Sequence, residues 1–180
     1  MTHRALCVLI HGGKFEFRAK LPTGQGVWPA LWMLPQTEKH GPWAGSGEID
    51  ILEVRGQEPQ KILGTLHYGA RWPVNTHTSL DFTLPDNGTV ADFHVYALEW
   101  EPGEIRWYVD GWQFAAQSFW WSTSRVEGAK GLPPRSEADL NPWPAPFDHS
   151  FYLVMNIAVG GKFLGNPGPS TKFPVEMLVD

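Results

Sequence analysis

The 180-residue sequence contains a single cysteine, Cys7, which excludes a framework of intrachain disulfide bonds. It has no run of basic residues and a formal net charge of −5, so we expect no nucleic-acid partner. No apolar stretch approaches the ~20 residues that span a bilayer, so we expect no membrane association. The apolar run at 6–10 is too short for a signal-peptide core, and no small-residue cleavage site follows it. We therefore predict no signal peptide in this chain.

Helical periodicity is almost absent as well. Short apolar or alternating runs are separated by Pro, Gly, Asn and Asp, which is typical of strands and turns. Hairpins are predicted at 101–104 and at Asp110-Gly111, and the Pro-rich segment 125–146 is predicted to be a long functional loop. Strands are expected at 13–20, 29–34, 47–55, 62–68, 93–101, 105–110, 112–118, 151–159 and 174–179. With no repeat and no linker, residues 1–180 are predicted to form one all-β domain, a β-sandwich or jelly roll.

Tryptophan is what the sequence has in excess, with ten in 180 residues. Core tryptophans are expected to alternate within strands, whereas sugar-binding ones are expected beside carboxylates or in loops, because an indole face is a platform for sugar C–H groups. Trp100, Trp107 and Trp112 alternate inside dense strands and are predicted to be core residues. Trp120 and Trp121 are adjacent, so they point opposite ways and one of them is expected in the core.

Three acids carry the chemistry. In the segment GEIDILEV at 47–54, strand alternation places Glu48 and Asp50 on one face and Ile49 on the other. Plain alternation would bury Glu53 in the core, which is costly for a carboxylate. A β-bulge between Asp50 and Glu53 would reset the alternation and bring all three acids to one face. Two carboxyl groups ~5–5.5 Å apart are what a retaining glycosidase needs, although three acids on an exposed, inert strand face remain an alternative.

The flanking motifs make the resemblance specific. GEIDILE is similar to the signature of glycoside hydrolase family 16 in its longer form, which laminarinase-like, agarase-like and carrageenase-like members share. Further segments resemble laminarinase-like enzymes in order and spacing: GKFE at 13–16, KLPTG at 20–24, WPALWMLP at 28–35, GTLHYG at 64–69, EWEPG at 99–103, WYVDG at 107–111 and NIAVGG at 156–161. The resemblance implies a concanavalin-like jelly roll of two bent antiparallel sheets, with the substrate cleft on the concave face.

The resemblance also implies roles for individual residues. Glu48 would be the nucleophile, Glu53 the general acid/base and Asp50 the assisting carboxylate. Sugar-binding or cleft positions are expected for a further set: Trp28, Trp32, Trp43, His67, Trp121, Asn156 and Arg18. For each of these, packing or a solvated charge is the alternative, and for Arg18 the two interpretations are evenly balanced.

The two ends of the chain depart from the family pattern. Residues 1–12 are atypical, and family members usually carry further strands before residue 13 and after residue 180, so the domain is predicted to be truncated at both ends. Asp180 resembles one ligand of a structural calcium that many members hold away from the cleft. No cofactor is expected for catalysis itself.

The function that follows is retaining, internal hydrolysis of β-1,3-glucan of the laminarin type, with a secreted monomer expected from the resemblance. The alternatives are mixed-linkage β-glucanase, agarase, carrageenase or transglycosylase activity, or a non-catalytic β-glucan-binding protein. No cluster of Arg or Lys lies near the acids in the sequence to favour a sulfated substrate.

Overall fold

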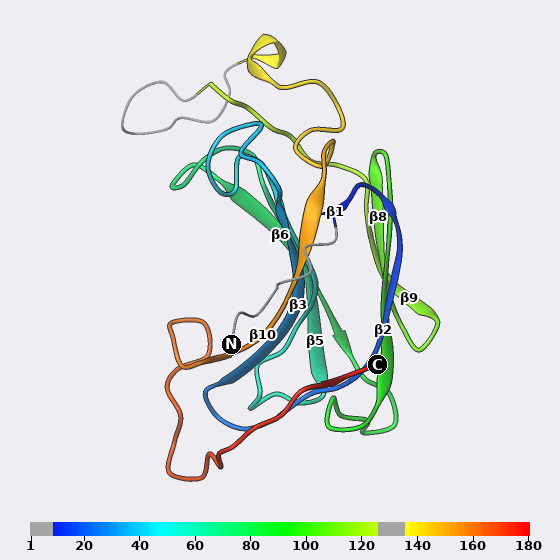
Figure 1. Ribbon diagram of the computed structural model, residues 1–180, viewed down its shortest axis with the longest axis vertical. Helices are drawn as coiled ribbons and strands as arrows, with labels where there is room; N and C mark the ends of the chain where they lie inside the picture. The colour runs from blue at the N-terminus through cyan, green and yellow to red at the C-terminus, as the bar shows by residue number, and fades with distance from the viewer. Residues whose placement is uncertain (1–8, 126–135) are drawn as a thin grey trace, which may run out of the picture.

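The computed structural model describes residues 9–125 and 136–180, which form two antiparallel β-sheets and one short 3₁₀ helix, η1 (Glu137–Asp139). Cys7, most of the apolar run at 6–10 and part of the predicted loop at 125–146 lie outside the described residues. The two sheets stack face to face as separate layers (Figure 1). Within the described residues, no helix is long and apolar enough to cross a membrane.

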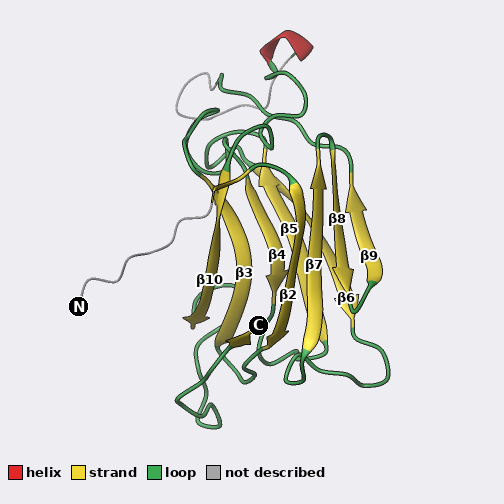
Figure 2. Ribbon diagram, turned by 45° about the vertical axis from the view of Figure 1, so that its right-hand side comes forward, coloured by secondary structure: helices red, strands yellow, loops and turns green. Residues whose placement is uncertain are grey.

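The first sheet has six strands and carries the three acids. Its spatial order is β1 (Leu9–Ile10), β10 (Phe151–Val159), β3 (Val27–Pro35), β4 (Glu48–Glu53), β5 (Lys61–Tyr68) and β6 (Thr76–Thr83). The second sheet has five strands, in the order β11 (Leu178–Val179), β2 (Gly13–Lys20), β7 (His94–Glu101), β8 (Glu104–Val109) and β9 (Trp112–Gln117). Strands of each sheet run side by side across the molecule (Figure 2).

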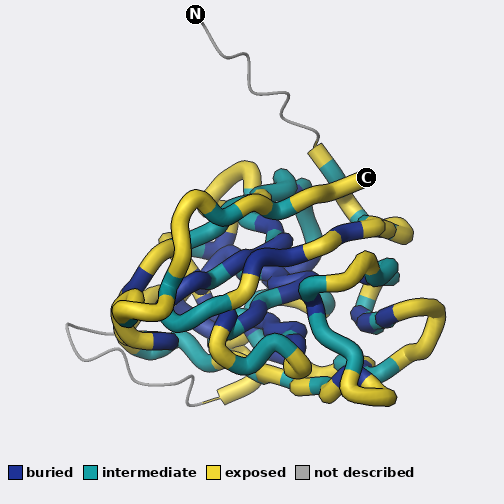
Figure 3. The backbone as a smooth tube through the Cα atoms, turned by 90° about the horizontal axis from the view of Figure 1, so that it is seen from below, coloured by how far each residue is buried: buried dark blue, intermediate teal, exposed yellow. Residues whose placement is uncertain are grey.

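The hydrophobic core fills the space between the two sheets, and the buried segments gather in the interior (Figure 3). The six-stranded sheet contributes fully buried side chains such as Leu31, Met33 and Ile49, and the five-stranded sheet contributes Trp100 and Trp107. These two tryptophans are 2% and 1% exposed, so their predicted core positions are confirmed. Removing so much apolar area from water is the main force that holds the layers together.

The prediction for Trp112 is wrong, because its side chain is 76% exposed. Trp112 begins β9, the edge strand of its sheet, and the pairing of β8 with β9 shifts register between Trp107 and Tyr108. Trp112 pairs with the buried Val109, so alternation alone does not account for its exposure, which follows from its place at the start of an edge strand. Ala115, rather than Trp112, pairs with Trp107 and is buried.

Most of the other predicted strands are present, with bounds that differ by one or two residues. The segment at 174–179 is largely irregular, because only Leu178–Val179 pairs as β11. β6 has no counterpart among the predicted strands. Both hairpins are confirmed, and Asp110 and Gly111 have φ values of 49° and 82°, as a two-residue turn of the favoured hairpin type requires.

Candidate active site

A β-bulge in β4 places the three acids on one face. Asp50 pairs with Thr65 and Glu53 pairs with Leu63, so two residues of β4 stand opposite Gly64 alone. This extra residue resets the alternation, as predicted from the cost of burying Glu53. The apolar members of β4 turn inward instead, and Ile49 and Leu52 are both fully buried.

The acids line a cleft of about 260 Å³ on the face of the six-stranded sheet that points away from the core. The strand β3 contributes Trp28, Ala30 and Trp32 to its wall, and β10 contributes Asn156 and Ala158. Because Asn156 pairs with Ala30 and Ala158 with Trp28, these side chains share one sheet face. The cleft therefore brings together the three acids and three of the predicted sugar-binding residues, Trp28, Trp32 and Asn156.

Each glutamate receives a hydrogen bond from a different indole. The Nε1–H of Trp43 donates to Glu48 Oε2 at 2.5 Å. The Nε1–H of Trp28 donates to Glu53 Oε1 at 3.2 Å, and the Thr65 hydroxyl donates to Glu53 Oε2 at 3.4 Å. Donors of this kind favour the ionised carboxylate and fix its orientation.

His67 lies between the first two acids. Its Nε2 is 3.5 Å from both Glu48 Oε1 and Asp50 Oδ2, and its ring lies 5.4 Å from that of Trp43. Burial lowers the pKa of His67 to about 4, so the imidazole is neutral at physiological pH. The buried Oδ2 of Asp50 accepts no hydrogen bond from the described residues. A proton on this oxygen would make it a hydrogen-bond donor, so the protonated form of Asp50 suits this position.

Burial dominates the electrostatics of the acids. It raises the pKa of Glu48 to about 7, with the Trp43 hydrogen bond acting in the opposite direction and the nearby Glu53 adding to the rise. Burial also raises the pKa of Asp50 well above its usual range, aided by its two acidic neighbours, and raises the pKa of Glu53. Three acidic groups in one partly dry cleft disfavour each other's ionisation. Burial and mutual repulsion thus favour keeping a proton in the cleft at a pH where an ordinary carboxyl group would have lost it, which suits acid/base chemistry.

The bulge is supported from beneath by the other sheet. The Nε1–H of Trp107 on β8 donates to the backbone carbonyl of Asp50 at 2.9 Å. A Cβ atom at Gly64 would lie 2.6 Å from Cδ1 and Nε1 of the same indole. Glycine at position 64 therefore lets the indole reach the bulge, and the hydrogen bond satisfies a buried carbonyl at the centre of β4.

Two other predicted residues have defined partners: Asn156 within the cleft, and Trp121, which is not among the residues that line it. Asn156 accepts a hydrogen bond at 2.7 Å from the Nε1–H of Trp32, which orients both side chains in the cleft wall. Trp121 is half-buried against the core, and its ring packs over Gly69, just past the end of β5. Its neighbour Trp120 is 2% exposed, so one of the adjacent pair is in the core as predicted.

The structure does not bring Arg18 to the acids. Arg18 lies on β2 of the five-stranded sheet, where its guanidinium contacts Asp180 at 3.1 Å and sits over the ring of Phe93 at 4.0 Å. A sugar contact in this cleft, as considered from the sequence, is therefore wrong for Arg18, because its strand belongs to the other layer. Asp180, the candidate calcium ligand, has this guanidinium as its charge partner.

Sequence reasoning missed Thr65 and Ala158 as site residues. Thr65 is two residues before His67 on the same strand, so alternation would have placed the two on one face. Ala158 follows Asn156 at the same spacing. Their small side chains carried no chemical signal of their own, and only the pairing of strands shows that they border the acids.

Among residues 9–125 and 136–180, two groups of side chains offer converging metal-ligand atoms: Glu48, Asp50 and His67, and, away from the cleft, His40, Asp148 and His149. In the second group His40 Nε2 and Asp148 Oδ1 are 2.7 Å apart, and Lys39 Nζ is 2.7 Å from the other Asp148 oxygen. Two ligands on a tetrahedral zinc stand about 3.3 Å apart, given zinc bonds of ~2.0–2.1 Å. The side chains of the second group therefore contact one another directly as ion pairs and stand too close together to hold a zinc ion between them.

Fold and cleft together define a class: an all-β sandwich with paired carboxylates on one strand of an open sheet face. The family model that matches residues 9–118 is that of the glycosyl hydrolases family 16, and the chain belongs to this family. Its two antiparallel sheets are the jelly-roll fold expected from the sequence.

Relatives with printed activities cover most of this chain. It is 48% identical over 172 residues, 93% of its length, to glucan endo-1,3-beta-glucosidase A1 of Niallia circulans. It is 37% identical, over 83% of its length, to a beta-1,3-glucan-binding protein of Penaeus monodon. The solved catalytic domain of an endo-1,3-beta-glucanase (laminarinase) from Thermotoga petrophila RKU-1 matches 96% of the chain with a TM-score of 0.76 and 36% identity. The chain spans 23%, 43% and 63% of the lengths of these three proteins, respectively.

Proposed function

We propose that this chain hydrolyses β-1,3-glucan internally, with retention of configuration at the anomeric carbon. The observation that carries the proposal is the bulged strand β4, which presents Glu48, Asp50 and Glu53 to one cleft. The names of the Niallia and Thermotoga relatives support the choice of linkage. An extracellular place of action fits a polymeric substrate of this kind, and we propose that the chain acts there as a monomer.

The proposed reaction has two steps. Glu53 protonates the glycosidic oxygen while Glu48 attacks the anomeric carbon, so the C–O bond to the leaving sugar breaks as the bond to Glu48 forms. Glu53, now a carboxylate, then takes a proton from water, which attacks the same carbon and releases Glu48. The chemistry assigned here uses carboxyl groups alone, and we propose that it needs no cofactor; a structural calcium involving Asp180 would lie on β2's side of the molecule.

Asp50 and Trp43 both act on the nucleophile in this scheme. The Trp43 N–H favours the ionised form of Glu48 that attack requires. The raised pKa of Asp50 favours its protonated form, in which it offers a donor next to Glu48 instead of a second negative charge. His67, neutral at physiological pH, closes the other side of the two carboxyl groups.

A second candidate function is binding of β-glucan without hydrolysis, which the name of the Penaeus relative favours. The presence of both glutamates in one cleft favours catalysis. Glu53→Gln separates the two functions: binding to laminarin is expected to persist, and hydrolysis to fall by ~10²–10⁴-fold, the usual contribution of general acid/base catalysis. Equal hydrolysis by the variant would remove Glu53 from its proposed role.

The test of the proposal measures reducing sugar and product length from laminarin, mixed-linkage β-glucan, agarose and carrageenan, with Glu48→Ala as the control. Short oligosaccharides from laminarin, abolished by Glu48→Ala, are expected. Release from another polymer instead would change the assigned substrate and leave the mechanism standing. No release from any polymer by a folded chain would overturn the enzymatic function.

A further inference from the structure

The loop between β3 and β4, residues 36–47, carries the indole that bonds to Glu48, and we call it the Trp43 loop. The Trp43 side chain is 39% exposed, and its ring contacts that of His67. The residues beside it are anchored more firmly, since Ala44 and Ser46 are both fully buried. What holds this loop therefore also sets the position of the donor to Glu48.

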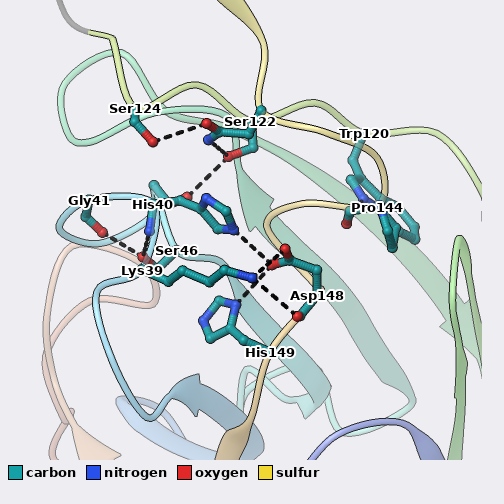
Figure 4. Close-up of polar contacts among 12 residues, drawn as sticks. Lys39, His40, Gly41, Ser46, Trp120, Ser122, Ser124, Pro144, Asp148 and His149 are labelled. Carbon is teal, nitrogen blue, oxygen red and sulfur yellow. Dashed lines mark hydrogen bonds and ion pairs between the residues drawn. The ribbon is translucent and has the colours of Figure 1, made fainter.

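Asp148, just before β10, is bound by the beginning of the Trp43 loop (Figure 4). Its Oδ2 accepts a hydrogen bond at 2.7 Å from Lys39 Nζ, and its Oδ1 lies 2.7 Å from His40 Nε2. His149 Nδ1 contacts the same Oδ1 at 3.1 Å. We call Asp148 with Lys39, His40 and His149 the Asp148 cluster.

Electrostatics favour a charged Asp148. Burial alone would raise the pKa of this carboxyl, but the hydrogen bonds from Lys39, His40 and His149 lower it well below its usual range. The His40 side chain is only 8% exposed, so its contact with the carboxylate is shielded from water. A charged hydrogen bond in such a place is among the stronger single contacts a loop can make.

The cluster continues through the loop to Trp43. The backbone N–H of His40 donates to Ser46 Oγ at 2.9 Å, and the Ser46 hydroxyl donates to the carbonyl of Gly41 at 2.7 Å. These two bonds join the first part of the loop, His40 and Gly41, to Ser46. Trp43 lies between these anchors in sequence, and Ser46 is two residues before Glu48. On the other side, the backbone N–H of Trp72 donates to the Trp43 carbonyl at 3.2 Å.

We propose that Asp148 is a positioning residue for catalysis: by holding His40 and Lys39 it fixes the Trp43 loop, and with it the indole N–H that orients and charges Glu48. This inference rests on the proposed function. Asp148 itself does not line the cleft that contains the acids. Its effect on the reaction therefore passes through Trp43, and this makes it separable from a general loss of stability.

The test is a double-mutant cycle. Asp148→Asn keeps the shape of the side chain and removes its charge, and we expect kcat on laminarin to fall about 10- to 100-fold, the scale of an ångström-size misplacement of a reacting group. KM is expected to change by less than about threefold. In a Trp43→Phe background, the same Asp148→Asn change is expected to lower kcat by no more than about threefold, because the group it positions is gone.

Asp110→Asn is the matched control. Asp110 also bonds to a histidine, with His94 Nδ1 at 2.6 Å from its Oδ2, but it lies in the β8–β9 turn of the other sheet. We expect its kcat to stay within about twofold of the unmodified protein. A similar fall in Asp110→Asn would mean that loss of any aspartate–histidine contact lowers the activity, and would overturn the proposal.

Hydrogen exchange gives a readout that is independent of activity. Amides of residues 38–47 are expected to exchange at least tenfold faster in Asp148→Asn, with β7 and β8 unchanged. Unchanged exchange in the loop, or kcat effects of Asp148→Asn and Trp43→Phe that simply multiply, would overturn the positioning role. If Glu48→Ala keeps full activity, it is the proposed function that fails, whereas an active enzyme with a silent Asp148→Asn refutes the Asp148 inference alone.

Discussion

Gly64→Ala is the substitution that tests the support beneath the catalytic strand. The added Cβ would lie 2.6 Å from Cδ1 and Nε1 of the Trp107 indole, closer than such contacts occur, so the ring must move. Overpacking of this kind costs about 1–3 kcal/mol. A displaced ring also leaves the Asp50 carbonyl without its 2.9 Å hydrogen bond, which costs about 1–3 kcal/mol for a buried acceptor.

Both costs arise from the same displacement of the Trp107 ring, so they do not add in full, and we expect a loss of about 2–4 kcal/mol in the free energy of unfolding. For a chain of this length that corresponds to a fall of roughly 4–16 °C in Tm. The assay is urea unfolding followed by tryptophan fluorescence, with laminarin hydrolysis measured on the folded variant. Activity is expected to fall as well, because the bulge sets where Asp50 and Glu53 point.

Gly168→Ala is the control, since a Cβ there meets only Gln25 Cγ at an ordinary 3.7 Å. It is expected to change stability by less than about 0.5 kcal/mol. The double variant Gly64→Ala/Trp107→Phe is expected to lose less stability than the sum of its parts, because the smaller ring relieves the clash. If Gly64→Ala unfolds at the same urea concentration as the unmodified chain, the indole does not support the bulge as we describe.

Three further predictions concern the acids and their donor. Trp43→Phe removes a hydrogen bond to a charged group, worth ~1.5–3 kcal/mol, so kcat/KM is expected to fall about 10- to 150-fold. Trp112→Phe, on the exposed edge of the other sheet, is the control and should leave kcat/KM unchanged. Because Glu48 must be ionised to attack and its pKa is raised to about 7, kcat/KM should fall as pH drops below about 7; a profile that is flat down to pH 5 would contradict the assignment. The pKa of Glu48 is 4.5 in the unfolded chain and about 7 in the folded one, so the protein loses stability as pH rises from 4.5 to 7 and this carboxyl ionises. Glu48→Gln removes the ionisation, so the variant should be about 3 kcal/mol more stable than the unmodified chain at pH 8 and equal to it at pH 4. Equal unfolding midpoints at pH 8 would show that burial of Glu48 carries no such cost.

The acids and their bulge could be predicted from the sequence, because alternation and the cost of a buried carboxylate are local arguments. β6 was missed because its inward positions are polar in the first half, Thr76 and Thr78, so that apolar alternation is confined to Leu80 and Phe82, a signal only three residues long. Arg18 was misplaced for a different reason. β2 alternates charged and apolar residues and shows which side chains share a face, but alternation does not say which of the two sheets a strand enters.

Contacts between distant segments were also beyond local reasoning. Trp107 lies 57 residues from Asp50, and Asp148 lies 108 residues from His40. Both contacts depend on how loops and layers meet, and neither leaves a spacing pattern in the chain. The candidate reacting groups could thus be predicted from the sequence, whereas the residues that position them could be identified only from the three-dimensional structure.

The indole on each side of the acids links saccharide occupancy to proton affinity. Trp28 lines the cleft and Trp43 is partly exposed beside His67, while their N–H groups bond to Glu53 and Glu48, respectively. A sugar ring that tilts either indole changes a hydrogen bond that favours the ionised carboxylate. By thermodynamic reciprocity, protonation of that carboxylate must then change the affinity for the sugar by the same factor. In the proposed function, binding of the polymer therefore helps to set the protonation state of Glu48 and Glu53.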